Sequence, residues 1–529
     1  MGRRRSGGVG ILAVVLVVLS ALAVSGQPPI PGRHTDHGRF GAQSAGYPPQ
    51  PIGVTASAPV SAQAYAGASG GDAVARALDD PDVVRLLGDR PELIGVAEVA
   101  SKGGAPAAHE VTWYVPGRVG SVVATVAGGR VVDVEEVPAA AWQPPLTGDE
   151  VDRAVAIARD AWAADGVDTA NLQGFGMHVM DADGSYPSTR MAYVTFAPHV
   201  DARPELLTWV DLTAGEVVRT RRQPPGPSPD APSHTGWSGD AGPPRSGTVD
   251  WRGWTFDYAV SGRMDGIALQ DVAFRGVRVL ERASMPAMTV FYDEDACGPF
   301  VDRLGGELTP VDWADGAEVV LREVTVLGEP WLELGILDTL GEYVLYQSFY
   351  LGGDGQLDAH TFAKGLQCET DHVHYPFWRF DVDLAGADGD QVVRDTADGE
   401  AVMATEFDLP ADAAAGHRWA VVDAATGHRV DVAFDDGSWN VPGQVVPEVL
   451  YETNTVHGRQ YQAGEAGTWR WPAVRDLPQG DPGTAIDDVV LWYRGFLPHT
   501  ADEGPDLWHS TGVRLTVDLA PGHFVRPRD

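Results

Sequence analysis

Three histidines in the C-terminal part of the chain have the type and spacing of metal ligands. His372 and His374 stand two residues apart in Asp371-His-Val-His-Tyr375, and His499 follows much later. Side chains two apart on a β-strand point to the same face, so the first two could hold one ion that His499 closes from a neighbouring strand. Three imidazoles with open coordination positions are typical of a catalytic copper or zinc centre. The sequence therefore predicts a metal site, provided that the three side chains meet.

The bulk composition places these ligands in a globular protein of several domains. The chain has 529 residues, of which 44% are hydrophobic and 21% charged, as in soluble folded proteins. We expect about two to four domains, because this length exceeds one compact core. The formal net charge of −36 argues against a nucleic-acid partner, which would require clustered Lys and Arg. It favours encounter with cations such as amines, although an acidic surface also serves solubility alone.

The N-terminus has the pattern of an export signal. Met1-Gly-Arg-Arg-Arg5 is followed by an apolar run over residues 10–24, and the small residues Ser25 and Gly26 come next. This order is typical of a signal peptide, and the run is short for a membrane span. We predict that residues 1–26 are a signal peptide or, alternatively, an uncleaved N-terminal anchor. The remainder would then be secreted, or held on the membrane facing outside.

Composition and periodicity divide the rest of the chain into five segments. Residues 27–70 are rich in Pro, Gly, Ala and Ser and predict a flexible linker. Residues 71–144 and 145–222 each combine a helical pattern with a few alternating strands, as in small α+β domains. Residues 223–247 form a Pro/Gly-rich linker. Residues 248–529 are nearly all short strands with Gly, Asp and Pro turns, which indicates a large β-sandwich. The predicted fold class is mainly β.

The start of the second α+β unit carries a helix signal. Thr147 is followed three residues later by Glu150, which is the pattern of a capping box. We therefore expect an amphipathic helix over residues 149–162.

The chain contains two cysteines, Cys297 and Cys368. In an exported protein such a pair predicts a disulfide, although free or metal-binding thiols are the alternative. Loop closure by this bridge would contribute roughly 4 kcal/mol. It would also tie together two segments that carry candidate site residues.

Several motifs in the C-terminal part resemble those of the copper amine oxidases. Trp251-Arg-Gly-Trp-Thr-Phe256, Ile267-Ala-Leu-Gln-Asp-Val272 and Arg278-Val-Leu-Glu-Arg-Ala-Ser284 resemble the opening strands of their catalytic domain. The resemblance covers most of residues 248–529 and, more loosely, residues 70–222. It implies two small α+β domains before a β-sandwich, and a homodimer.

The resemblance assigns the copper ligands. The family holds copper with a His-x-His pair and a distant third histidine, which correspond to His372, His374 and His499. His509 is a rival third ligand. His499 is preferred because it keeps the family's distance from Asp488 and Trp492.

The family also converts a tyrosine into topaquinone, and Tyr343 falls on that position without a gap. Protein side chains alone supply no good two-electron carbonyl sink, so a cofactor is needed. The neighbours differ from the family, which has Asn-Tyr-Asp/Glu-Tyr where this chain has Glu342 before the tyrosine and Val344 and Leu345 after it. The alternative is that Tyr343 is an ordinary tyrosine of the sandwich.

Three further residues match catalytic positions of the family. Asp302 resembles its catalytic base, Phe300 its aromatic gate, and Tyr292 the tyrosine that hydrogen-bonds the quinone. The alternative for Asp302 is a turn aspartate before a Gly-Gly pair.

Three aspartates resemble the family's secondary metal site. Asp381, Asp383 and Asp488 could bind calcium through hard oxygen ligands. The alternative is a set of strand-end aspartates on an acidic surface.

The resemblance implies oxidative deamination of a primary amine by dioxygen, giving aldehyde, ammonia and hydrogen peroxide. Copper and topaquinone would be the cofactors, and Asp302 would remove the α-proton of the substrate. The altered residues beside Tyr343 support an alternative, a catalytically inactive copper-binding extracellular homologue without topaquinone. A third hypothesis is a metal-free β-sandwich that binds a ligand, which would require the three histidines to lie far apart.

Overall fold

The structure is a computed structural model of the chain, and the described residues are distributed along most of its length. They are residues 54–60, 62, 70–88, 91–99, 108–116, 120–181, 183–198, 205–223, 244–261, 266–293, 297–302, 304, 318–326, 328–340, 343–386, 389–396, 398–410, 418–434, 455–462, 474–501 and 508–519.

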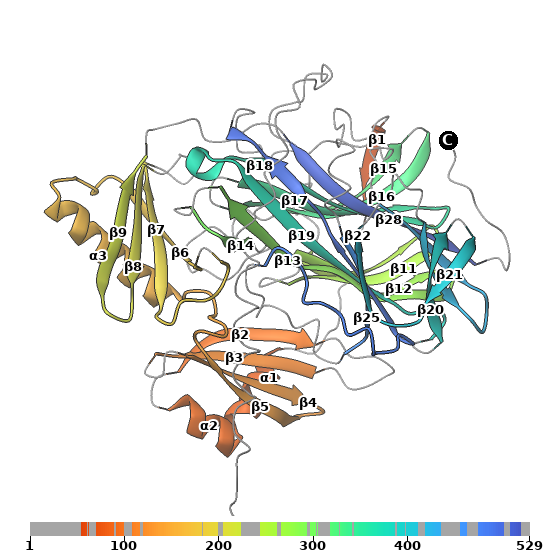
Figure 1. Cartoon of the computed structure of the whole chain (residues 1–529), viewed down its shortest axis with the longest axis horizontal. Coiled ribbons are helices and arrows are strands. Elements are labelled where there is room, and N and C mark those ends of the chain that lie inside the picture. Colours follow the sequence, from red (N-terminus) through yellow and green to blue (C-terminus); the bar gives the residue numbers. More distant parts are fainter. Residues whose placement is uncertain are drawn as a thin grey trace, which may run out of the picture. The chain divides into compact units, whose positions relative to one another are not determined.

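Two large antiparallel sheets dominate the fold (Figure 1). The first contains ten strands in the order β1-β15-β16-β17-β18-β28-β24-β23-β20-β21. Their bounds are β1 Val54–Pro59, β15 Glu318–Val326, β16 Glu329–Leu340, β17 Tyr343–Gly352, β18 Gln356–Gly365, β28 His509–Asp518, β24 Arg429–Phe434, β23 Trp419–Asp423, β20 Asp390–Thr396 and β21 Gly399–Met403.

The second sheet has the order β10-β11-β12-β13-β19-β26-β25-β22, and the short strands β14 and β27 pair with β13 and β19. The bounds are β10 Ser246–Trp251, β11 Trp254–Ser261, β12 Gly266–Phe274, β13 Val277–Tyr292, β14 Phe300–Asp302, β19 His372–Val382, β22 Phe407–Pro410, β25 Thr455–Gln460, β26 Val489–Arg494 and β27 Leu497–His499.

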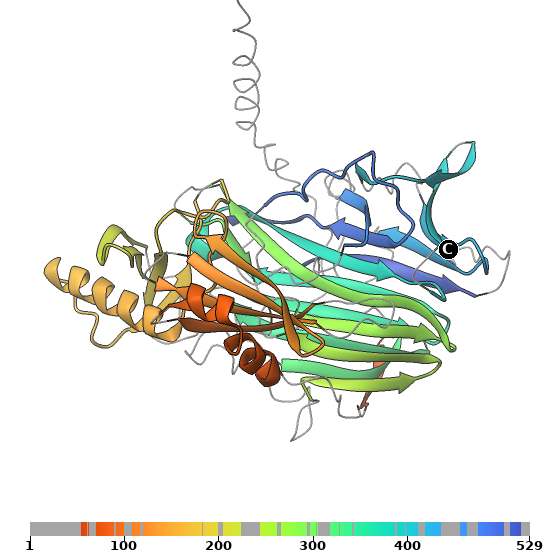
Figure 2. The same cartoon turned by 90° about the horizontal axis from the view of Figure 1, so that it is seen from below.

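Side chains from the two sheets share one hydrophobic core, and Figure 2 shows the long green and teal strands running side by side. Trp378 of β19 packs with its ring centroid 5.3 Å from that of Phe349 of β17. Trp378 and Trp254 of the second sheet also hydrogen-bond to the first sheet. Trp378 Nε1 donates to Thr361 Oγ1 at 3.1 Å, and Trp254 Nε1 donates to the Gly352 carbonyl at 2.8 Å. Because each indole N–H donates a hydrogen bond, these large rings can be buried without leaving an unpaired polar atom.

The first α+β unit has a four-stranded sheet in the order β2-β3-β4-β5. Apolar side chains of two helices pack against it in one cluster. The bounds are α1 Gly70–Leu78, α2 Pro81–Leu87, β2 Glu92–Val99, β3 Ala108–Val115, β4 Gly120–Ala127 and β5 Arg130–Pro138.

The second unit packs helix α3, Gly148–Ala164, against the sheet β6-β7-β8-β9. The predicted capping box is confirmed, since Thr147 Oγ1 accepts from the Glu150 amide and Glu150 Oε2 accepts from the Thr147 amide. Arg190 forms a buried ion pair with Glu150 at 2.8 Å, so this helix start is fixed to the sheet. The strand bounds are β6 Gln173–His178, β7 Met191–Ala197, β8 Leu206–Asp211 and β9 Glu216–Arg222.

The mainly-β class with a large sandwich and small α+β units is confirmed. One part of the linker prediction is wrong, because residues 54–59 form β1 and pair antiparallel with β15. Local composition could not show this, since the partner strand lies more than two hundred residues away and edge pairing satisfies backbone groups whatever the side chains. The predicted leader, residues 1–26, lies outside the described residues. Among the helices that the structure describes, none has both the length and the apolar character needed to span a bilayer.

Candidate metal and redox site

The three predicted histidines meet at one end of the second sheet. His372 and His374 lie on β19, every residue of which is buried, and β27 pairs with that strand so that His499 stands directly opposite His372. All three side chains are buried. One ligand nitrogen from each comes within 4.8 Å of the other two, which is the separation that a shared ion requires.

The hydrogen-bond partners of the three rings also fit a metal. The Nε2 atoms of His372, His374 and His499 are buried and make no hydrogen bond. The other nitrogen of His372 donates to the Thr370 carbonyl at 3.1 Å, and His499 bonds to the backbone of Gly365. Buried polar atoms without partners are rare and costly. Three neighbouring imidazoles, each with such an atom, have the character of a metal site, and in His372 and His499 the opposite nitrogen is held by a backbone acceptor.

The protonation state of two of these histidines suits metal binding. Burial lowers the pKa of His372 well below its usual value of 6.5, and the neighbouring His374 lowers it further. Burial, together with His509 and His372, likewise lowers the pKa of His499 well below 6.5. Imidazole must be neutral to bind a metal ion, so few protons need to leave these rings.

These pKa shifts predict a pH-dependent stability of the metal-free protein. Below about pH 6.5 the unfolded chain protonates both histidines, whereas the folded state keeps them neutral. The free energy of unfolding should therefore be unaffected by them above that pH. Below that pH, the free energy of unfolding should fall by up to about 1.4 kcal/mol per pH unit for each histidine. Urea unfolding in the presence of a chelator measures this, and a His372→Gln/His499→Gln variant should show a shallower slope. Equal slopes for the two proteins would contradict the assignment.

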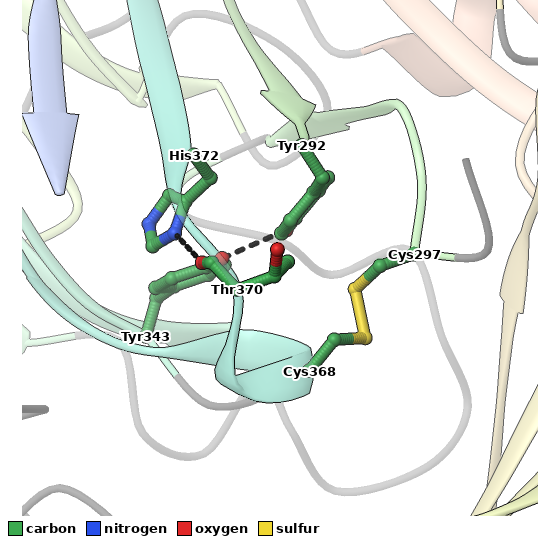
Figure 3. Close-up of a disulfide and its surroundings, with 6 residues drawn as sticks. All are labelled: Tyr292, Cys297, Tyr343, Cys368, Thr370 and His372. Carbon is green, nitrogen blue, oxygen red and sulfur yellow. Dashed lines mark hydrogen bonds between the residues drawn. A yellow bond between two sulfur atoms is a disulfide. The ribbon is translucent and has the colours of Figure 1, made fainter. Parts of the chain in front are cut away.

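Tyr343 is brought to the histidines from the opposite sheet. It is the first residue of β17, is 1% exposed, and its ring centroid lies 5.2 Å from that of His372 and 4.7 Å from that of His374. Its hydroxyl is 2.8 Å from the hydroxyl of Tyr292 at the end of β13, as Figure 3 shows. Burial raises the pKa of Tyr292 well above its usual value of 10.0, and the neighbouring Tyr343 and Asp302 raise it further, so its phenol is kept protonated.

Phe300 and Asp302 lie on β14, beside these tyrosines. The Phe300 ring makes an edge contact with Tyr292, with centroids 5.9 Å apart. The Asp302 side chain is 10% exposed, and its Oδ2 lies 3.2 Å from Nδ1 of His374. The structure thus brings seven predicted side chains to one place, from β13, β14, β17, β19 and β27.

Cys297 and Cys368 form a disulfide with Cα atoms 6.1 Å apart. It joins the loop after Tyr292 to the turn before His372 (Figure 3). Gly298, next to the bridge, has φ +132°, and a Cβ added there would lie 2.6 Å from the Tyr292 ring. The bridge therefore ties this loop to the turn before His372, and the absence of a side chain at Gly298 lets the loop lie close against the tyrosine ring.

Removal of this bridge should destabilise the protein by about 4 kcal/mol, because it closes a loop with a sequence separation of 71. We expect a Cys297→Ser/Cys368→Ser variant to unfold at correspondingly lower urea concentration. Wild-type protein measured under reducing conditions is the control and should match the variant. An unchanged unfolding midpoint would show that the bridge adds nothing.

The three aspartates predicted to bind calcium do not gather as metal ligands. Among the described residues, only the histidine trio brings three or more such groups together. Asp381 instead accepts from Arg379 Nη2 at 3.1 Å, and Asp383 lies 3.4 Å from Arg278 Nη1. Guanidinium groups thus lie against two of these carboxylates, and calcium binding by the three aspartates stays a prediction. Asp488 lies beside Gln460, which accepts from its backbone amide.

Two contacts were not foreseen from the sequence. His509, the rival ligand, lies outside the converging trio, with its ring centroid 4.2 Å from that of His499. Tyr193 of the second α+β unit packs against Phe300 with centroids 5.7 Å apart. No local pattern marks Tyr193, because the contact joins segments about a hundred residues apart.

Comparisons with known proteins agree with this geometry at the level of the fold. No protein-family model and no curated protein matches the sequence. Among solved structures, a copper-containing benzylamine oxidase from Hansenula polymorpha matches with a TM-score of 0.55 and 12% identity, covering 82% of this chain and 94% of that one. Lysyl oxidase from Pichia pastoris matches with a TM-score of 0.53 and 11% identity, covering 88% and 92%. An amine oxidase from Aspergillus nidulans matches with a TM-score of 0.52 and 12% identity, covering 91% of each chain. This chain therefore has a copper amine oxidase-like fold, and its buried histidine trio is suited to hold a metal.

Proposed function

We propose that this protein oxidises primary amines, converting amine, dioxygen and water into aldehyde, ammonia and hydrogen peroxide. One observation carries the proposal. Three buried imidazoles, each with an Nε2 that makes no hydrogen bond, bring one ligand nitrogen apiece within 4.8 Å of one another, and a buried phenol, Tyr343, lies against two of those rings. The suitability of the histidines for a metal, the oxidisable ring beside them and the likeness of the fold to amine oxidases all favour amine oxidation.

His372, His374 and His499 would hold copper, whose fit is supported by the donor set and by the neutral state of His372 and His499. Copper and dioxygen would convert Tyr343 into a quinone, which supplies the carbonyl and the two-electron acceptor that amine oxidation needs. Tyr292 orients this ring through the 2.8 Å contact between the two hydroxyls. Because its pKa is raised, Tyr292 stays protonated and can donate to the oxygen of residue 343.

Asp302 is the carboxylate placed to take a proton from the substrate. It lies among Tyr292, Phe300 and His374, and a base held close to the reacting carbon gains from fixed orientation. Phe300, packed between Tyr292 and Tyr193, would border the path of the amine.

A second candidate is a copper-holding extracellular protein without a quinone. The residues beside Tyr343 favour it, since Val344 and Leu345 are buried apolar side chains where the family has polar neighbours. In that case the histidine trio would serve metal binding alone.

Copper loading under air separates the two candidates. The oxidase proposal predicts a coloured protein that reacts with phenylhydrazine and releases peroxide from at least one amine of an aliphatic and aromatic panel. A protein that holds copper but gives neither signal would support the second candidate and end the first.

We also propose that the protein is exported, and that it forms a homodimer. The N-terminal pattern of basic and apolar residues supports export, and the amine oxidase-like fold supports the dimer. N-terminal sequencing of the mature protein and sedimentation of the purified protein test these two points.

A further inference from the structure

Asp302 directly contacts one of the three histidines, His374. Oδ2 of Asp302 lies 3.2 Å from Nδ1 of His374, and the side chains are 10% and 0% exposed. Both atoms are buried, and among the described residues neither meets the geometry of a hydrogen bond, to the other or to any third group. The 3.2 Å separation is nevertheless within hydrogen-bonding distance.

The three imidazoles differ in what lies behind them. His372 is backed by the carbonyl of Thr370 and His499 by the backbone of Gly365. His374 alone is backed by a carboxylate. A charged acceptor fixes the proton on Nδ1, leaves the lone pair on Nε2, and makes the ring a stronger donor to a metal.

The strand pairing shows where the two residues lie relative to each other. β14 and β19 lie on opposite sides of β13, so that Val290 stands between Phe300 and His374, and Met288 stands between Asp302 and Pro376. Asp302 therefore reaches His374 across an intervening strand.

We propose that Asp302 is a positioning residue for the metal, holding His374 through Oδ2. The inference rests on the metal-binding half of the proposed function and not on quinone formation. If amines are oxidised, one carboxylate then serves both halves of the site, with Oδ2 directed to the ligand and Oδ1 left for the substrate.

Copper affinity tests this without any measurement of activity. In a Tyr343→Phe background, which lacks the phenol hydroxyl needed for quinone formation, copper affinity is measured by competition with a chelator. Loss of an outer-shell partner of this kind weakens metal binding about 10–100-fold, and we expect that loss for Asp302→Ala and a smaller loss for Asp302→Asn. The spectrum of bound copper(II) in electron paramagnetic resonance should change in the same variants.

Asp293→Asn is the matched control, because Asp293 is an exposed carboxylate just after β13 and its loss removes the same charge. Asp302→Glu, which retains a carboxylate, should recover affinity and also covers the case in which the alanine variant fails to fold. Affinity and spectrum equal to the Asp293→Asn control would overturn the proposal. If in addition Asp302→Asn in the unmutated background loses amine oxidation, the aspartate acts on substrate alone and the proposed function stands.

Discussion

Replacing Tyr343 by phenylalanine should abolish both phenylhydrazine reactivity and amine oxidation while leaving copper binding intact. The substitution removes only the phenol hydroxyl, and the ring can stay packed with its centroid 4.7–5.2 Å from those of two histidine rings. Since no other side chain can supply the carbonyl, we expect the activity to fall to background and not merely to decline. Peroxide release from the most reactive amine and copper content of the purified protein measure the two properties.

Tyr292→Phe is the matched control for this experiment. It breaks the same 2.8 Å hydroxyl contact but leaves Tyr343 able to be oxidised. It should retain phenylhydrazine reactivity with a lower rate of turnover, because the ring of residue 343 loses its fixed orientation. Residual oxidation in Tyr343→Phe at the wild-type rate would place the oxidisable group elsewhere, and the proposal would fail.

Replacing His499 by alanine should greatly weaken copper binding at the site. His499 stands opposite His372 in the strand pairing and contributes one of three converging nitrogens. Loss of a direct ligand costs more than loss of an outer-shell partner, so we expect His499→Ala to weaken copper binding by more than about 100-fold. Chelator competition on the purified protein gives this value.

His509→Ala provides the comparison, since it removes the same ring from a position only 4.2 Å away. His509 lies outside the converging group, so its loss should weaken copper binding by less than about tenfold. The opposite ranking, with His509 needed and His499 dispensable, would mean that the rival ligand is the true one.

The sequence predicted which side chains gather at the site better than it predicted the strands around them. A His-x-His pair on a buried strand must place both rings on one face. The positions of His499 and Tyr343 could be assigned because the motifs around them resemble those of the copper amine oxidases. Those features depend on the spacing of residues along the chain, which a sequence shows directly. The same holds for the capping box at Thr147, whose partners are three residues apart.

What the sequence could not predict depends on which strands become neighbours. The pairing of β1 with β15 and the contact of Tyr193 with Phe300 join distant segments. The arginines that contact Asp381 and Asp383 were likewise not foreseen, and calcium binding there stays a prediction. The contact of Asp302 with His374 depends on the aim of two side chains across β13, and no spacing shows it.

The central claim is that copper held by the three histidines acts on Tyr343. Mass spectrometry of the peptide that contains this tyrosine, taken from protein loaded with copper without oxygen and then exposed to air, tests it most directly. We expect a mass increase located on Tyr343 that appears only after air is admitted. Protein that holds one equivalent of copper and yields an unaltered Tyr343 peptide would contradict it.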